Sequence, residues 1–83
     1  MALEKNEDFA EKFGQRITQI REERGWTKQA LADMLDIERR QLLRIEQGKV
    51  NTSLQAALAL ANAFGISLPE LLTFDFEQKA DSH

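Results

Sequence analysis

Apolar residues recur at intervals of three and four along this 83-residue chain, and this spacing is what most limits its possible folds. The first example is the stripe formed by Phe9, Phe13, Ile17 and Ile20. Such intervals place side chains on one face of an α-helix, whereas a half-buried strand would alternate apolar and polar residues. We find no strand pattern of that kind, and only one proline is present to interrupt the helices. The sequence therefore predicts an all-α fold.

Capping residues divide the chain into five expected helices. Ser, Thr and Asn accept hydrogen bonds from the free N–H groups of a first turn, and glycine commonly ends a helix in the left-handed conformation. We expect N-caps at Asn6, Thr27, Ser53 and Ser67, and helix ends at Gly25, Gly48 and Gly65. The third helix, from Glu38 to Gln47, follows the second after a joint of only three residues, 36–38. A joint this short holds the two helices at a fixed angle.

The fourth expected helix, between Ser53 and Gly65, is apolar on two sides. Leu54, Leu58 and Ala61 lie on one side, and Leu60 and Phe64 lie on the other. A helix with two apolar sides is expected to be covered on both. We therefore predict that this helix is the centre of the core, and that Trp26, at the junction of the first two helices, fills a gap in it.

The composition excludes several classes of protein. A chain of 83 residues forms one domain with a small core, and without cysteine it has neither disulfides nor thiolate metal sites. No apolar run reaches the roughly 20 residues that span a membrane, and the N-terminus does not resemble an export signal. The only histidine, His83, has no catalytic partner, and neither do the adjacent Glu22 and Glu23. We expect a soluble cytoplasmic protein that is not an enzyme and has no metal or cofactor.

The charge is unevenly distributed along the chain. A net charge of -3 argues at first against a nucleic-acid partner, because phosphate binding uses Lys and Arg. However, residues 24–51 carry six basic and four acidic side chains, while residues 52–83 carry one basic and four acidic ones. Positive charge is therefore concentrated in the middle third of the chain.

The third expected helix separates this positive charge from its apolar side. At 100° per residue, Leu42, Ile45 and Gln41 point toward the core. The opposite face carries three arginines and one leucine, which are Arg39, Arg40, Arg44 and Leu43. Two helices joined by a tight turn, with the second facing outward, form the helix-turn-helix arrangement that binds DNA.

Longer motifs strengthen this interpretation. They are "GQRITQIREERGW", "TKQALADML", "LLRIEQGKVNTSL" and "LALANAFGISLPELL". With these motifs, residues 13–72 resemble the DNA-binding domain of Cro/C1-type regulators, the XRE family. The resemblance implies a compact five-helix domain like that of the lambda repressor, with the second and third helices as the helix-turn-helix. It divides the chain into an N-terminal extension (1–8), the DNA-binding domain (9–73) and a C-terminal tail (74–83).

The resemblance also implies roles for individual residues. Bases in the major groove would be contacted by Arg39, Arg40, Leu43 and Arg44. Phosphates would be contacted by Thr27, Lys28, Gln29, Lys49 and Asn51. Arg21 and Glu46 would form a structural ion pair that orients the third helix. Asp36 replaces the glycine usual in the turn, which is tolerable because Asp enters the left-handed region readily.

Double-stranded DNA, in the form of an inverted-repeat operator, is thus the expected partner, and a homodimer would read both halves. We expect the dimer contact at Leu71, Leu72, Phe74 and Phe76, the alternative being that these aromatic rings fold back on the first or fourth helix. The expected function is transcription regulation, by repression. The alternative is an antitoxin or a protein-interaction module of the same fold, which would bind a partner protein and regulate its own operon.

Overall fold

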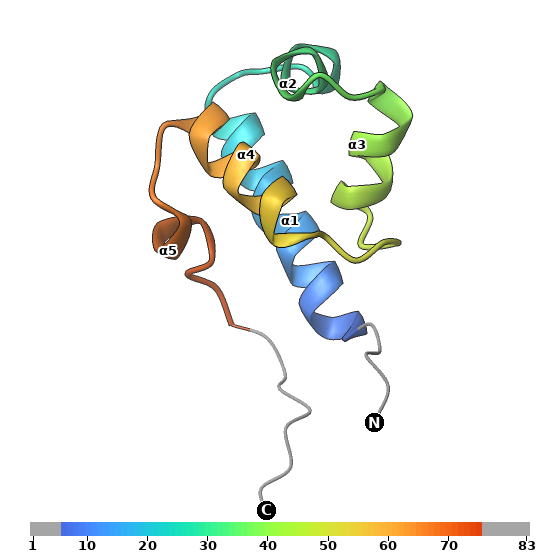
Figure 1. Cartoon of the computed structure of the whole chain (residues 1–83), viewed down its shortest axis with the longest axis vertical. Helices are drawn as coiled ribbons and strands as arrows, with labels where there is room; N and C mark the ends of the chain where they lie inside the picture. Colours follow the sequence, from blue (N-terminus) through green and yellow to red (C-terminus); the bar gives the residue numbers. More distant parts are fainter. Residues whose placement is uncertain (1–5, 76–83) are drawn as a thin grey trace, which may run out of the picture.

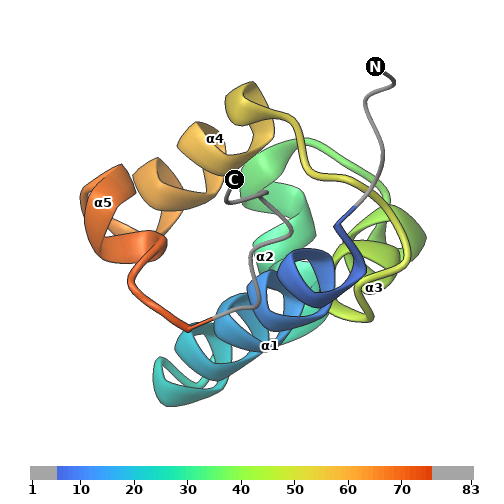
Figure 2. The ribbon, with the colours of Figure 1, turned by 90° about the horizontal axis from the view of Figure 1, so that it is seen from below.

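The computed structural model describes residues 6–75, and these form five α-helices without a strand. The helices are α1 (Glu7–Glu23), α2 (Lys28–Leu35), α3 (Arg39–Glu46), α4 (Leu54–Phe64) and α5 (Leu68–Leu71). In Figure 1, α4 lies in front of α1. Around this pair, α2 lies at the top, α3 at the right and α5 at the left, and Figure 2 shows α3 and α5 again on opposite sides. None of these helices has both the length and the apolar composition needed to cross a membrane. The all-α prediction is confirmed.

Each expected N-cap is observed. The side chains of Asn6, Thr27, Ser53 and Ser67 each accept a hydrogen bond, 2.9 to 3.1 Å long, from the backbone N–H three residues later. α3 differs, because its N-cap is Glu38 and no side chain caps its first turn. Local sequence chemistry therefore accounts for where four of the five helices begin.

The ends of the first four helices share one backbone conformation. Gly25, Gly48 and Gly65 have φ angles of +71° to +73°, and Asp36 takes the same region at φ +58°. After each of them, the next N–H group bonds to a carbonyl five residues earlier, at 3.0 or 3.1 Å, which closes the helix. The prediction that Asp36 can replace a glycine in the turn is confirmed.

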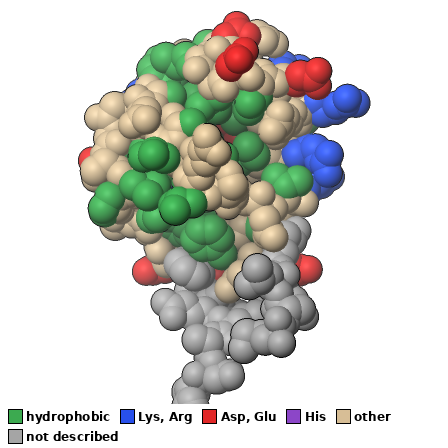
Figure 3. Space-filling model, in the orientation of Figure 1, with side chains coloured by type: hydrophobic (Ala, Val, Ile, Leu, Met, Phe, Trp, Pro, Cys, Tyr) green, Lys and Arg blue, Asp and Glu red, His purple; other side chains and the backbone are tan. Residues whose placement is uncertain are grey.

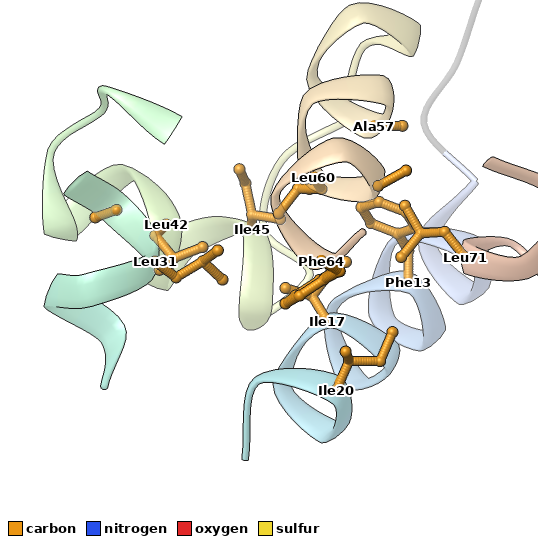
Figure 4. Close-up of a cluster of buried hydrophobic side chains, with 12 residues drawn as sticks. Phe13, Ile17, Ile20, Leu31, Leu42, Ile45, Ala57, Leu60, Phe64 and Leu71 are labelled. Atoms are coloured by element: carbon orange, nitrogen blue, oxygen red, sulfur yellow. The ribbon is translucent and has the colours of Figure 1, made fainter. Parts of the chain in front are cut away.

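The core lies between α1, α4 and α5 and continues to α2 and α3 (Figure 4). Its fully buried large side chains are Phe13, Ile17, Leu31, Leu42, Leu60 and Leu71. Trp26 is half-buried against this core, and its ring lies 5.8 Å from that of Phe64. The predicted role of Trp26 at the junction of the first two helices is confirmed.

Two predictions of burial were wrong. α4 is covered on one face only, and its buried residues, Ala57, Leu60, Ala61 and Phe64, follow a single helical stripe. Leu54 is 72% exposed and Leu58 is 49% exposed. On α3, Gln41 is exposed rather than directed into the core. The single stripe of α4 packs in one cluster with side chains of the other four helices, so none of the helices within residues 6–75 remains to cover its second apolar side.

The C-terminal part of the domain packs onto the same chain. Leu71 is fully buried, so it belongs to the core and is not available for the predicted dimer contact. Leu72 is partly buried, and the Phe74 ring lies 5.6 Å from that of Phe9 and 6.2 Å from that of Phe13. For Phe74, the fold-back alternative is the one observed. Phe76 lies outside the described residues.

Candidate DNA-binding surface

The outward face of α3 carries three exposed arginines. Leu42 and Ile45 are buried on its inner side, while Arg39, Arg40 and Arg44 are exposed. Leu43 lies among them and is half-buried. Figure 3 shows basic side chains gathered at the edge of the molecule where α3 lies. The helix therefore presents positive charge to the solvent and apolar side chains to the core.

The six arginines of the chain fall into two groups of three. The three on or next to α1 bond internally: Arg16 donates to the carbonyls of Leu71 and Glu70, Arg21 pairs with Glu46, and Arg24 donates to the carbonyl of Phe64. The three on α3 have no hydrogen-bond or ion-pair partner within residues 6–75. Each guanidinium carries five N–H donors and no acceptor. All donors of the α3 group thus remain available to a ligand.

A buried ion pair holds α3 against α1. The Nε atom of Arg21 donates to Oε2 of Glu46 at 2.8 Å, and Nη2 donates to Oε1 at 3.3 Å. The Nη1 group of Arg21 also donates to the Trp26 carbonyl at 2.9 Å. The two side chains are only 7% and 4% exposed. This geometry limits both the tilt and the rotation of α3 relative to α1, because the fork of the guanidinium engages both carboxylate oxygens.

Two glycines bring the backbones of α1 and α3 together. A Cβ atom at Gly14 would lie 2.4 Å from the carbonyl oxygen of Glu46. At Gly48 it would lie 2.7 Å from the Cα of Glu11. Sequence reasoning identified Gly48 only as a helix end and missed Gly14. The available signal was a glycine inside a helical pattern, which lowers helix propensity and usually has a packing reason.

The first turn of α2 presents three polar side chains. Thr27 uses its hydroxyl oxygen to cap the helix, and Lys28 is half-buried without a partner in the described part of the chain. The side-chain amide of Gln29 donates to Asp33, one turn later on the same helix, at 2.8 Å. The amide group has a second N–H, so Gln29 can donate to a phosphate while it keeps that bond.

A groove of about 470 Å³ runs between α3 and the start of α4. Arg40 and Arg44 line it from α3, Asn51 from the following loop, and Ser53 and Ala56 from α4. Three of the predicted DNA contacts, Arg40, Arg44 and Asn51, are therefore neighbours in space. Lys49 is exposed on a different surface, beside Glu7 and Glu11 of α1, and does not line the groove.

An exposed basic helix that follows a short helix and a tight left-handed turn defines a class of protein, the helix-turn-helix DNA-binding regulators. The family model described as helix-turn-helix matches residues 17–71, and the chain belongs to that family, in its Cro/C1-type branch. The resemblance inferred from the motifs is thereby confirmed.

Individual relatives agree with this assignment. An uncharacterised HTH-type transcriptional regulator from Archaeoglobus fulgidus is 33% identical over 63 residues, which cover 76% of this chain and 90% of the relative. The restriction-modification controller protein C.AhdI from Aeromonas hydrophila matches with a TM-score of 0.71 at 36% identity, over 77% of this chain and 96% of that one. SinR, the master regulator for biofilm formation, solved in complex with DNA, matches with a TM-score of 0.66 at 31% identity, over 72% of this chain and 97% of that one. The chain is a DNA-binding transcription regulator.

Proposed function

We propose that this regulator is a cytoplasmic repressor that binds operator DNA as a homodimer and reads the major groove with α3. The observation that carries the proposal is the group of three exposed arginines on α3, which have no partner among the described residues 6–75. Arginine makes bidentate hydrogen bonds to O6 and N7 of guanine, the commonest specific contact in protein–DNA complexes. The operator is therefore expected to contain guanines at the positions that α3 meets.

The base-reading group consists of Arg39, Arg40, Leu43 and Arg44. Leu43 lies between the arginines and would contact the methyl group of a thymine. The phosphate-binding group consists of Thr27, Lys28, Gln29, Lys49 and Asn51. Phosphate contacts set the register of the protein on DNA but carry no sequence information. Glu38, exposed at the start of α3, would repel a phosphate that came too close and so disfavour incorrect docking.

The acidic net charge is compatible with this function because only one surface meets the phosphates. Six of the eleven basic residues lie in the segment 24–51, which contains the helix-turn-helix. The acidic surplus belongs to the segments before and after it. Repression by such a dimer requires only that it occupy the promoter.

The test is fluorescence-anisotropy binding to the DNA upstream of the protein's own gene, at several salt concentrations and against random DNA. We expect a preference for the upstream fragment of about 10³-fold or more. The Arg39→Ala, Arg40→Ala double variant should lose this preference and keep weak, salt-dependent binding. Lys12→Ala, on α1 beside Phe74 and Asp75, is the matched control and should keep the preference.

Equally weak binding to both DNAs would contradict the proposal. That result would favour the antitoxin or protein-interaction alternative, and the product of the neighbouring gene would then be tested for complex formation by co-purification.

A further inference from the structure

The segment 50–69 contains no charged residue, although 30% of the whole chain is charged. It covers the end of the loop after α3, all of α4 and the start of α5. Charged side chains normally cover the solvent-exposed faces of helices, because they are rarely buried. An exposed helical face without any of them requires a specific explanation.

The exposed side of α4, here named the α4 face, consists of Leu54, Gln55, Leu58, Ala59 and Asn62. Leu54 and Leu58 are one helical turn apart and therefore adjacent, with 72% and 49% of their surfaces exposed. Figure 3 views the molecule from the side of α4 and shows hydrophobic and uncharged side chains across the centre, with charged groups mainly at the rim. An apolar patch with a charged rim is typical of a protein–protein contact.

A hollow lies directly beside this face. Its volume is about 230 Å³, and Gln55 and Ala59 of the face form one of its walls. Leu35 and Ile37, at the end of α2 and in the turn, form another. The hollow can accept an apolar side chain, and the α4 face presents two of them. The same surface thus carries both the projecting leucines and a complementary recess, as a two-fold contact requires.

We infer that a second copy of this chain packs on the α4 face, α4 against α4, around a two-fold axis. The charge distribution favours a second copy over a different protein. A chain with net charge -3 repels its own copies, and a two-fold contact centred on charges of one sign would bring like charges together. An uncharged face avoids that repulsion, but it has no charge with which to attract a partner of opposite sign.

This inference rests on the proposed function and names the surface of the homodimer. Ser53 and Ala56, in the N-cap and first turn of α4, line the groove between α3 and α4 together with Arg40 and Arg44. The α4 face therefore borders the DNA-binding surface. A two-fold axis in this face that runs toward α3 would place the α3 helices of both copies on the same side of the dimer, as an inverted repeat demands.

The test is sedimentation velocity on the full chain without DNA, at concentrations from about 1 to 100 µM. We expect the wild type to have the mass of two chains. The Leu54→Glu, Leu58→Glu variant should have the mass of one chain, with dimerisation weakened by at least about 100-fold, because four carboxylates would meet at the axis. Both side chains are exposed, so circular dichroism should show an unchanged helix content.

Met34→Glu is the matched control, since it places a carboxylate at an apolar α2 residue that is 55% exposed and lies outside the α4 face. It should remain a dimer. A monomeric wild type at the highest concentration, or a dimeric Leu54→Glu, Leu58→Glu variant, would overturn the inference.

DNA binding separates this inference from the proposed function. The wild type should bind the inverted repeat more tightly than a single half-site, whereas the Leu54→Glu, Leu58→Glu variant should show no such gain over its own half-site affinity. Suppose that the wild type is a dimer, that this variant is a monomer, and that the wild type shows no preference for an operator. The proposed function then fails and the inference stands. A monomer that prefers its operator would refute the inference alone.

Discussion

Arg21 of α1 and Glu46 of α3 form a buried, two-point ion pair, with 2.8 Å between Nε and Oε2 and 3.3 Å between Nη2 and Oε1. α3 has only eight residues, and isolated helices of that length are not stable in water. Its existence and its orientation therefore depend on what it packs against. The pair is buried between α1 and α3 while the arginines are exposed, so it can hold the helix without occupying the DNA-binding face.

Glu46→Ala should lower the free energy of unfolding by about 3–5 kcal/mol, because it leaves the Arg21 charge buried without a partner. Urea denaturation monitored by circular dichroism measures this loss. The double variant Arg21→Met, Glu46→Leu should be more stable than Glu46→Ala, since no unpaired charge remains. A loss below about 1 kcal/mol for Glu46→Ala would place the pair among ordinary surface contacts.

Gly14→Ala should destabilise the protein by about 1–3 kcal/mol, because the new Cβ would lie 2.4 Å from the Glu46 carbonyl oxygen. The sign of the change in stability distinguishes this clash from the effect of helix propensity. Helix propensity alone would make this substitution stabilising by roughly 0.5–1 kcal/mol. At Gly25 a Cβ meets nothing within 4 Å, so Gly25→Ala measures only the cost of placing alanine at a positive φ, a loss of stability of about 1–2 kcal/mol. Thermal melting of both variants makes the comparison, and a stabilised Gly14→Ala would refute the close approach of α1 and α3.

Phe74→Ala should lower stability by about 1–3 kcal/mol, because the ring packs on Phe9 and Phe13 and is half-buried. Chemical denaturation measures the loss, with the exposed neighbour Asp75→Ala as the control. The mass in solution should match that of the wild type. A change from two chains to one on Phe74→Ala would instead assign the dimer contact to the C-terminal end.

Lys28→Ala and Lys49→Ala should each reduce the slope of log K against log salt by about 0.9, because one phosphate contact is lost. The preference for the operator over random DNA should stay the same, since phosphates carry no sequence information. Arg44→Ala should reduce that preference, with a cost of about 1–3 kcal/mol at one base position. Anisotropy titrations at several salt concentrations distinguish these effects, and an unchanged slope for Lys49→Ala would limit the DNA surface to the groove and the first turn of α2.

Three arginines are exposed on α3 and three bond internally, and the sequence predicted the first group more completely than the second. The helical wheel placed the three arginines and the buried Leu42 and Ile45 of α3 correctly, but it placed Gln41 on the wrong side. The wheel could not reveal that Arg16 and Arg24 are engaged in internal bonds. Their acceptors are backbone carbonyls 40 to 55 residues away, which carry no sequence signature.

The sequence by itself determined where the helices begin and end, because those signals are local. Four of the five N-caps in the described residues accept a bond from an N–H three residues away, and each left-handed residue closes the helix that it follows. Only the tertiary structure decided which apolar residues are covered. Ala32 and Ala57 are buried, while Met34, Leu54 and Leu58 are exposed. Burial depends on which stripe the neighbouring helices reach, and a helix with two apolar sides fits either choice equally well until its neighbours are in place.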